Sequence, residues 1–442
     1  MTGQLHLATG TAEVLASLRL SLSGVEAPVT APLPPGGPER AQTYAMLRPD
    51  EPVTEPDAAA IVATSGSTGR PRGVVLSRTA LIASAQATAT RLGGPGSWVL
   101  ALPAHYVAGL MVLARALVGD RPAYPMDGRL AGLAALVEGE LAAIDGRAYT
   151  ALVPTQLSRA LADPVVTRAL TRFDAVLLGG AAADRALLEH AAAAGIKIVT
   201  TYGMSETCGG CVYDGLPLDG VEVSTDDHGR IGIGGPTLFS GYRLDPAATN
   251  AILVDGRLRT RDRGQFVGQR LTVLGRLDDI VISGGMNVDL AAVERAVRAW
   301  LTETERSAAA EPVAEIKEPD ATNRAGVTTA EAAVVGVPHP EWGTEVVAVV
   351  ETEHNHPFVP ASPPGSSATG ATKGGFSLAE LRQGLSAELP HYALPRRLLI
   401  RALPRTSGGK IDRRRLVADL ERAEQCCSVR GRAGRDELQG HI

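Results

Sequence analysis

The sequence contains few cysteines and few aromatic residues, and it has no long apolar run. Four cysteines in 442 residues are too few for the disulfide framework of a small secreted protein. No run of about 18 apolar residues is present, and the N-terminal residues MTGQLHLATG lack the charged and then apolar layout of a signal peptide. We therefore expect a soluble cytoplasmic protein in a reducing compartment.

Neither sign of charge is in large excess. The net charge is −5 at pH 7, so the chain has no general attraction to nucleic acid or to an anionic membrane surface. A hydrophobic content of 45% over 442 residues is enough to bury a large core. This length predicts two or three domains.

The most informative stretch that is present is residues 64–73, which reads TSGSTGRPRG. It lies between two apolar, β-prone runs, residues 58–63 and 74–76, and is therefore expected to be a turn. Its glycines allow backbone N–H groups to fold around an anion, and its hydroxyl groups add donors. The hydroxyls belong to Thr64, Ser65, Ser67 and Thr68. The stretch predicts a phosphate-binding loop, although a Ser/Gly linker is equally consistent with its composition alone.

The first half of the chain is expected to form a layered α/β sheet. Short apolar segments alternate with Ala- and Leu-rich helical stretches, and ligands of such sheets collect at the strand ends. The expected strands are residues 98–102, 148–153, 175–178 and 196–201, with helices at 78–92 and 110–117. Before them, residues 1–56 are predicted to hold one helix, 11–20, followed by an irregular Pro/Gly-rich connection, 32–38.

The second half of the sequence has a different pattern of predicted elements. Short strands separated by Gly, Asp and Pro turns predict a mostly β subdomain over residues 215–275. A small α+β domain is expected to follow, with helices at 290–300 and 378–387 and strands at 332–337 and 346–351. Two Ala-, Pro-, Gly-, Ser- and Thr-rich stretches, 308–329 and 354–375, predict flexible insertions. The tail, residues 421–442, has no pattern that we can assign.

Four further motifs follow the phosphate-binding stretch in order: TYGMSET (201–207), RTRD (259–262), GRLDDI (275–280) and PRTSGGK (404–410). As an ordered set, they resemble the adenylate-forming enzymes, which include acyl-CoA synthetases, adenylation domains of nonribosomal peptide synthetases, and luciferase. The resemblance implies the adenylate-forming enzyme fold, in which layered α/β sheets and a β subdomain form a large N-terminal domain. The implied divisions are an N-terminal domain (1–275), a hinge (276–283), a small mobile α+β lid domain (284–420) and the tail.

The resemblance implies a two-step reaction that uses ATP, Mg²⁺ and CoA. A carboxylate attacks the α-phosphate of ATP to give an acyl-adenylate and pyrophosphate, and a thiol then displaces AMP. The positions implied to bind ATP are Thr64, Ser65, Gly66, Ser67, Thr68, Gly69, Arg72, Gly179, Gly180, Ala181, Tyr202, Gly203, Met204, Ser205, Asp262 and Arg276.

Several of these positions have chemistry suited to the implied role. Tyr202 can stack on the adenine, and Asp262 is implied to accept both ribose hydroxyls. Glu206 offers a hard oxygen ligand to Mg²⁺. Thr207 is implied to hydrogen-bond the α-phosphate. Arg72 stands where the family usually has lysine, which keeps the charge and changes its shape.

Lys410 is the implied catalytic lysine. An ammonium group in a glycine-rich loop can bridge the acyl carboxylate and the phosphate as charge develops. Composition alone would favour an exposed lysine in a basic run, and it is the order of the motifs that favours catalysis. Asp278 is the implied hinge, whose backbone rotation turns the small domain between the two half-reactions. After rotation, the loop with Gly284 and Gly285 is implied to help form the CoA tunnel.

Three other features have two interpretations each. His105 follows a predicted strand and is either a residue of the acyl pocket or a structural histidine. His339 belongs to a turn of the small domain, and we interpret it as structural. Cys208 and Cys211 have the CxxC spacing of redox or zinc sites. Because no second CxxC is present, we interpret them, with Gly209, as small residues lining the acyl pocket.

The acyl substrate depends on the segment after the TYGMSET motif. The short chain and the run of residues 202–221, YGMSETCGGCVYDGLPLDGV, closely resemble the actinobacterial o-succinylbenzoate-CoA ligases of menaquinone biosynthesis. Such a substrate is a compact aromatic dicarboxylate, so its pocket is expected to contain polar or cationic groups. The candidates are His105, Thr155 and Ser205.

Two alternatives remain open from the sequence. One is another aryl or short-chain acyl-CoA ligase. The other is a non-catalytic module that binds nucleotide or a carrier, against which the presence of Lys410, Glu206 and Asp262 argues. Homodimers are common among members of this family, so a second copy of the chain is a candidate partner.

Overall fold

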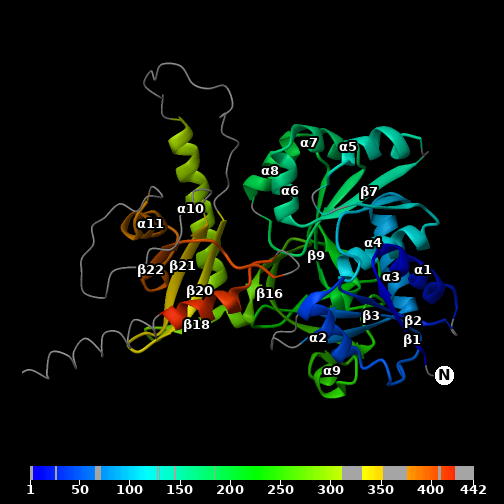
Figure 1. Ribbon diagram of the computed structural model, residues 1–442. Coiled ribbons are helices and arrows are strands. Elements are labelled where there is room, and N and C mark those ends of the chain that lie inside the picture. Colours follow the sequence, from blue (N-terminus) through cyan, green and yellow to red (C-terminus); the bar gives the residue numbers. More distant parts are fainter. Residues whose placement is uncertain are drawn as a thin grey trace, which may run out of the picture. The chain divides into compact units, whose positions relative to one another are not determined.

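The structure is a computed structural model. It describes residues 3–24, 27–64, 71–126, 128, 130–143, 146–183, 185–310, 331–351, 376–406 and 410–423, with only the backbone described for 305–310. The chain divides into two compact units, Met1–Val273 and Leu274–Ile442, which are considered separately (Figure 1). Among the described residues, no helix is long and apolar enough to cross a membrane.

The first unit begins with a five-stranded sheet in the order β1-β2-β3-β4-β14. Strands β3 and β4 are antiparallel, and Thr64 pairs with Arg72 at the end of their ladder. The predicted phosphate-binding stretch therefore connects two paired strands that are buried in the core, and its residues 65–70 lie outside the described residues. The strands and the two associated helices are β1 (Leu5–Thr9), α1 (Thr11–Ser23), β2 (Val29–Leu33), α2 (Gly37–Leu47), β3 (Ala58–Thr64), β4 (Arg72–Ser77) and β14 (Gly241–Tyr242).

The prediction of one helix and an irregular connection in this N-terminal part was wrong. Helix α1 was expected, but β1, β2 and α2 were missed. Strand β2 contains Pro32 and is fully buried, and α2 begins with Pro38 in its first turn. Proline is tolerated in the first turn of a helix, because the N–H group that it lacks has no intrahelical partner there. The Pro/Gly content of residues 32–38 therefore marks a strand end and a helix start instead of a loop.

A second sheet has seven strands in the order β11-β10-β9-β8-β7-β5-β6. Strands β9, β8, β7, β5 and β6 are parallel to one another, as expected for an α/β sheet, whereas β10 pairs with β9 in the antiparallel direction. The strands are β5 (Gly96–Leu100), β6 (Ala123–Pro125), β7 (Arg147–Leu152), β8 (Ala175–Leu178), β9 (Ile198–Met204), β10 (Gly209–Tyr213) and β11 (Leu216–Pro217).

Both faces of this sheet are covered by helices (Figure 1). Side chains of β5 alternate, so Trp98 and Leu100 face a core shared with α1, α3 and α4. Val99 lies in the opposite core, with α5 to α8. These helices are α3 (Arg78–Arg91), α4 (Val107–Val118), α5 (Leu133–Leu136), α6 (Pro154–Leu161), α7 (Pro164–Leu170) and α8 (Arg185–Ala193). Burial on both faces explains why these strands are continuous apolar runs in the sequence.

The predicted β subdomain is confirmed as a third sheet. Its order is β12-β13-β16-β15, with β17 paired to β16. It consists of β12 (Glu222–Thr225), β13 (Arg230–Gly234), β15 (Leu253–Val254), β16 (Arg257–Val267) and β17 (Arg270–Arg276), with one short helix, α9 (Pro246–Ile252).

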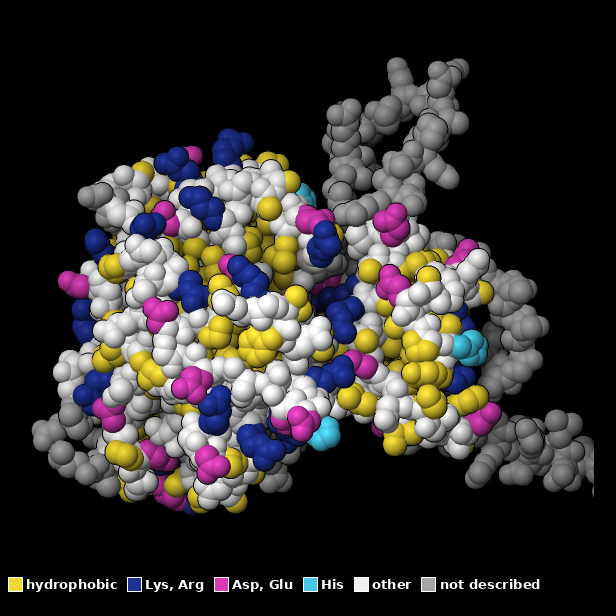
Figure 2. Space-filling model, turned by 180° about the vertical axis from the view of Figure 1, so that it is seen from behind, with side chains coloured by type: hydrophobic (Ala, Val, Ile, Leu, Met, Phe, Trp, Pro, Cys, Tyr) yellow, Lys and Arg dark blue, Asp and Glu magenta, His cyan; other side chains and the backbone are white. Residues whose placement is uncertain are grey.

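On the face of the molecule seen in Figure 2, basic and acidic side chains are interspersed.

The second unit is the small α+β domain that was expected. Its sheet has the order β19-β18-β21-β20, with β22 paired to β21, and α10 and α11 pack on one face. Its elements are β18 (Ile280–Ser283), β19 (Met286–Asp289), α10 (Leu290–Ala310), β20 (Glu331–His339), β21 (Gly343–Glu351), α11 (Leu378–Leu385) and β22 (Arg397–Ile400). The predicted insertions and tail fall largely on residues 311–330, 352–375 and 424–442, which lie outside the described part of the chain.

Candidate active site

The carboxyl ends of four neighbouring parallel strands gather predicted site residues at one edge of the seven-stranded sheet. His105 follows β5, Thr155 follows β7, Gly179 follows β8, and Ser205 follows β9. Ligands of α/β sheets bind at this edge, because the loops after parallel strands meet there. The sheet topology thus brings together predicted acyl-binding and nucleotide-binding positions that are far apart in the sequence.

The turn after β8 has no space for a side chain at its first glycine. A Cβ atom added to Gly179 would lie 2.4 Å from Oγ1 of Thr201 on β9. The next residue, Gly180, has a φ of +85°, which favours glycine. Ala181 follows and is exposed. The close approach of two strands therefore explains the glycines locally, and their contact with a nucleotide remains a prediction.

Glycine is also required within the TYGMSET motif. A Cβ atom on Gly203 would lie 2.0 Å from the carbonyl oxygen of Gly209. Met204 and Ser205 follow, at the point where β9 ends and a short 3₁₀ turn, Ser205–Thr207, begins. All three predicted ATP-binding positions are partly buried.

Tyr202 and Asp262 are joined across two sheets. The Tyr202 hydroxyl, on β9, donates a 2.8 Å hydrogen bond to Oδ2 of Asp262, on β16. Burial raises the pKa of Tyr202, and the nearby Asp262 charge raises it further, so the phenol stays protonated and acts as the donor. The predicted adenine-stacking residue and the predicted ribose acceptor are therefore in direct contact.

Glu206 is held by a residue that the sequence analysis did not identify. The Tyr242 hydroxyl donates a 2.6 Å hydrogen bond to Oε1 of Glu206. The guanidinium carbon of Arg72 lies 5.1 Å from the centroid of the Tyr242 ring, within the range of a cation–π contact.

Thr64, opposite Arg72, donates from its hydroxyl to the Arg72 carbonyl at 3.4 Å. Ser65, Gly66, Ser67, Thr68 and Gly69 lie outside the described residues.

Glu206 is suited to hold Mg²⁺ together with a nucleotide. Within the described part of the chain, no group of three or more His, Cys, Asp or Glu side chains could hold a metal by itself. Mg²⁺ commonly binds through one or two carboxylates and the phosphates of its substrate, and it retains several waters. One partly buried carboxylate beside a predicted phosphate-binding stretch fits this arrangement.

Thr207 is fully buried. Its hydroxyl donates to the Gly209 carbonyl at 2.7 Å and accepts from the Met204 N–H at 2.9 Å. Cys208 follows in the left-handed region, with a φ of +51°. The hydroxyl closes this turn in the structure, and its predicted contact with the α-phosphate remains a prediction.

The CxxC pair does not have the surroundings of a zinc or redox site. Cys208 and Cys211 are both buried and both free thiols. Burial raises the pKa of Cys211 to about 12, and burial also raises that of Cys208. Within the described part of the chain, no other side chain completes a set of three metal ligands with them, and thiol exchange needs an accessible thiolate, which burial disfavours. Both cysteines are therefore small residues packed in the interior, and their place in the lining of the acyl pocket remains a prediction.

Arg115 is a second residue that the sequence analysis missed. It lies on α4 and is only 7% exposed. Its Nη2 donates to the Tyr213 hydroxyl at 3.3 Å, and its guanidinium carbon lies 5.3 Å from the centroid of the Trp98 ring. Its Nε has no hydrogen-bond partner among the described residues. A Cβ atom on Gly209, a predicted acyl-pocket residue, would lie 3.9 Å from Nη2. Arg115 is therefore a buried cation close to a residue that is predicted to line the acyl pocket.

His105 is less suited to bind a carboxylate. Burial lowers its pKa, and the opposing charge of Glu39 is the smaller effect, so the imidazole is neutral at pH 7. Its ring lies 4.2 Å from the ring of Tyr106, whose hydroxyl donates to Glu39 at 2.7 Å. This arrangement is compatible with a structural histidine and with a neutral pocket wall.

In the second unit, the segment around Lys410 is anchored on both sides. Before it, Arg405 pairs with Glu331 and, at 2.9 Å, with Glu351. After it, Nη2 of Arg413 lies 2.7 Å from both carboxylate oxygens of Glu294 on α10. Lys410 is exposed between these anchors, and residues 407–409 lie outside the described residues.

The predicted hinge and CoA residues lie at the start of the second unit. Arg276 and Asp278 form an ion pair of 3.3 Å. Gly284 and Gly285 have φ values of +57° and +79°, so this turn favours glycine at both positions. Their functional roles remain predictions. His339, whose Nδ1 accepts from the N–H of Glu341 at 3.2 Å, is part of a turn, as expected for a structural histidine.

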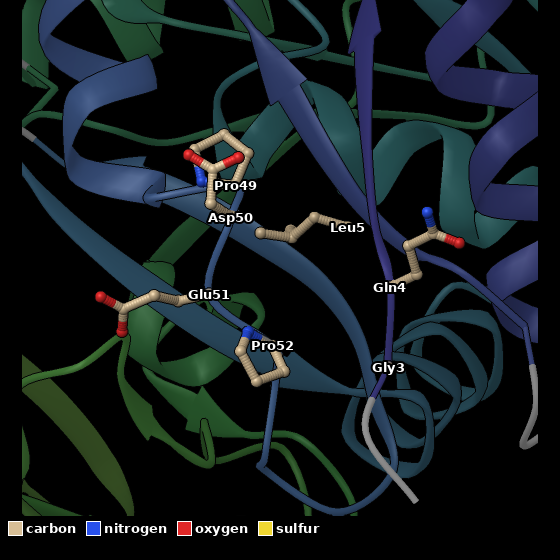
Figure 3. Close-up of a pocket in the computed structure, with 7 residues that line it drawn as sticks. All are labelled: Gly3, Gln4, Leu5, Pro49, Asp50, Glu51 and Pro52. Carbon is tan, nitrogen blue, oxygen red and sulfur yellow. The ribbon is translucent and has the colours of Figure 1, made fainter.

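One pocket lies elsewhere on the first unit. It has a volume of about 240 Å³ and lies between β1 and the loop after α2 (Figure 3). Its lining residues are Gly3, Gln4, Leu5, Pro49, Asp50, Glu51 and Pro52. None of the predicted site residues lines it.

Comparison with known proteins agrees with the predicted fold. The model of the AMP-binding enzymes matches residues 10–244, and the model of the AMP-binding enzyme C-terminal domain matches residues 328–410. A probable 2-succinylbenzoate–CoA ligase of Mycobacterium tuberculosis is 37% identical over 422 residues, 93% of this chain and 97% of that protein. A 2-succinylbenzoate–CoA ligase of Listeria monocytogenes is 28% identical over 81% of this chain and 69% of its own length.

A solved structure has the same fold. It is the O-succinylbenzoate coenzyme A synthetase of Bacillus subtilis, in complex with ATP and magnesium ion. The match has a TM-score of 0.60 and 24% identity, and it covers 80% of this chain and 68% of that one.

Proposed function

The chain belongs to the AMP-binding enzyme family as an AMP-forming acyl-CoA ligase, and we propose that it converts 2-succinylbenzoate to 2-succinylbenzoyl-CoA in menaquinone biosynthesis. In the first step, a carboxylate oxygen attacks the α-phosphorus of ATP, and the bond to the departing pyrophosphate breaks. In the second step, the CoA sulfur attacks the acyl carbon, and AMP leaves. The observation that carries the proposal is the 37% identity over 97% of the length of a probable 2-succinylbenzoate–CoA ligase.

The nucleotide would bind across the first unit. Tyr202 would stack on the adenine, while Asp262, already fixed by the Tyr202 hydroxyl, would accept the ribose hydroxyls. Arg72 and the stretch 64–69 would hold the phosphates as pyrophosphate departs. Glu206 would hold Mg²⁺, which supplies positive charge to the phosphates when it is bound.

The second unit would supply the positive charge of Lys410 for adenylation. It would also supply the rotation that separates the two half-reactions. Lys410 is exposed and sits between two ion-paired arginines, so its ammonium can reach a ligand without any loss of buried packing. Asp278, in a 3₁₀ turn at the start of this unit, is the proposed pivot. Gly284 and Gly285 are the proposed CoA contacts.

The second carboxylate of the acid needs a cation in its pocket, and Arg115 is the residue we propose for it. A dicarboxylate offers a planar group that a guanidinium can bind in a bidentate manner. The contacts of Arg115 among the described residues are a hydroxyl and an aromatic ring, so the buried guanidinium still has donors to offer. His105 is neutral at pH 7 and would contribute shape instead of charge.

Substrate profiling tests this function. Purified protein with ATP, Mg²⁺ and CoA is assayed for pyrophosphate release over a panel of carboxylic acids. We expect 2-succinylbenzoate to have the highest kcat/KM. Robust turnover of benzoate or a fatty acid with none of 2-succinylbenzoate would assign another acyl-CoA ligase. ATP binding without adenylate formation from any acid would assign a non-catalytic module.

A further inference from the structure

A short segment, residues 239–243, is hydrogen-bonded to two separate parts of the candidate site. Its strand β14 pairs with β4, and the Arg243 N–H donates to the Gly73 carbonyl at 2.7 Å. At its other end, the Phe239 N–H donates to the Glu206 carbonyl at 2.9 Å. The segment therefore connects the strand that leaves the phosphate-binding stretch to the turn that carries Glu206.

Arg243 fixes the position of this segment. It is only 5% exposed, and its guanidinium donates to main-chain carbonyls at the end of α2 and in the following loop. The acceptors are Leu47 (3.1 Å), Pro52 (2.8 Å), Arg48 (3.3 Å) and Glu51. Because several donors of one planar group are used at once, the backbone next to Tyr242 has little freedom to shift.

The Tyr242 side chain then places one oxygen of Glu206. Tyr242 is only 7% exposed, and its ring packs against that of Phe239 at a centroid distance of 5.1 Å. Burial raises the pKa of Tyr242, and the Glu206 charge adds to this, so the hydroxyl remains a donor. The hydrogen bond occupies one of about four lone-pair positions of the carboxylate, which leaves the second oxygen open.

The same ring also carries Arg72 on its face. A phenol that donates to a carboxylate and supports a guanidinium keeps opposite charges on two sides of one rigid group. The cation belongs to the strand that ends the phosphate-binding stretch, and the anion belongs to the turn proposed to hold Mg²⁺.

We propose that Tyr242 is a positioning residue for Mg²⁺-ATP, an inference that rests on the proposed function. It fixes Oε1 of Glu206 so that the other carboxylate oxygen faces the metal, and it holds Arg72 beside the phosphates. A purely structural tyrosine would instead affect stability and leave the dependence on Mg²⁺ unchanged.

The test measures ATP affinity by calorimetry over a series of Mg²⁺ concentrations, which does not require turnover. Tyr242→Phe keeps the ring and removes only the hydroxyl, so the packing against Phe239 is retained. We expect the half-saturating Mg²⁺ concentration to rise at least about 10-fold, as for loss of a hydrogen bond to a charged group. ATP affinity without Mg²⁺ should stay within about twofold of the wild type, because the nucleotide contacts are unchanged.

Tyr149→Phe is the matched control. Its hydroxyl is also an internal donor, to the carbonyls of Leu92 at 3.1 Å and Gly94 at 3.0 Å, on a strand end away from Glu206. It should lower the thermal unfolding temperature and leave the Mg²⁺ series unchanged. The inference about Tyr242 is overturned, and the proposed function is not, if the half-saturating Mg²⁺ concentration is unchanged in Tyr242→Phe. The same holds if that concentration rises equally in Tyr149→Phe. A wild-type protein that binds no ATP would overturn the proposed function as well.

Discussion

The hydroxyl of Tyr202 lies 2.8 Å from Oδ2 of Asp262 and connects the seven-stranded sheet to the β subdomain. Tyr202 belongs to β9 and Asp262 to β16, so the two residues are 60 positions apart in the chain. The hydrogen bond limits the rotation of the carboxylate and leaves its other oxygen free to accept. The residue proposed to stack on adenine thereby also orients the residue proposed to bind ribose.

Tyr202→Phe should therefore weaken ATP binding although the aromatic ring is kept. We expect KM for ATP to rise about 12-fold, because loss of a hydrogen bond to a carboxylate costs about 1.5 kcal/mol. The measurement is pyrophosphate release at varied ATP, with 2′-deoxy-ATP as the control nucleotide. Tyr202→Phe should raise KM for 2′-deoxy-ATP by a smaller factor than KM for ATP, because 2′-deoxy-ATP already lacks one hydroxyl that Asp262 is proposed to bind. An equal loss with both nucleotides would contradict an orienting role toward ribose.

Arg115→Met should lower activity with 2-succinylbenzoate much more than activity with benzoate. The buried guanidinium is proposed to bind the second carboxylate, so its removal should lower kcat/KM for 2-succinylbenzoate about 100-fold, equivalent to about 3 kcal/mol for a buried charged pair. Turnover of benzoate, which lacks that carboxylate, should change less than about threefold. Arg115→Lys keeps the charge without the planar fork and should be intermediate. Equal losses for both acids would indicate that Arg115 only supports the core through Tyr213 and Trp98.

The sequence predicted the elements that are marked by local pattern. Strands such as β8, whose predicted and observed limits are both residues 175–178, are short apolar runs followed by turn residues. Their parallel arrangement then places the loops after them at one edge. The resemblance implied that Gly179 and Ser205 bind ATP, and the parallel strands place both at this edge, while their contacts with a ligand remain predictions.

The missed residues depend on contacts between distant parts of the chain. Tyr242 is 36 positions from Glu206, and Arg115 is 98 positions from Tyr213. A tyrosine after a glycine has no local signal for this role. Arg115 did have a local signal, because it is the only charged residue in the apolar helix of residues 107–118, VAGLMVLARALV. A single charge in such a helix must either reach the surface or serve a buried partner.

Lys410→Ala should abolish adenylation without unfolding the protein. The side chain is exposed, so its removal leaves no cavity, whereas loss of a positive charge at the reacting phosphate should lower the adenylation rate by about 100- to 1000-fold. Single-turnover formation of the acyl-adenylate measures this step directly. Lys197→Ala, which also removes an exposed lysine, is the control and should retain full activity. Adenylation at the wild-type rate in Lys410→Ala would exclude the proposed catalytic role.

Asp278→Pro should separate the two half-reactions. Asp278 lies in the first turn of a 3₁₀ segment, Leu277–Asp279, and proline is generally tolerated in the first turn of a helix. The change should preserve adenylation and slow thioester formation at least about tenfold, because a fixed φ restricts rotation at the proposed pivot. Asp278→Ala removes the same carboxylate and its contact with Arg276 without fixing φ, so it should support both steps. Equal loss of both steps in the proline variant would count against a hinge.

The buried thiols predict a loss of stability at alkaline pH. Burial raises the pKa of Cys211 to about 12 and also raises that of Cys208, whereas a thiol in the unfolded chain has a pKa of about 8.5. Above that value the unfolded state binds fewer protons than the folded state, so the free energy of unfolding decreases as pH rises. Two thiols should remove about 2 kcal/mol between pH 8.5 and 9.5, below the pH at which tyrosines of the unfolded chain ionise. Urea unfolding across this range measures the slope in a Cys426→Ser, Cys427→Ser background. Adding Cys208→Ala and Cys211→Ala should flatten it, and a slope that persists would assign the pH dependence to other groups.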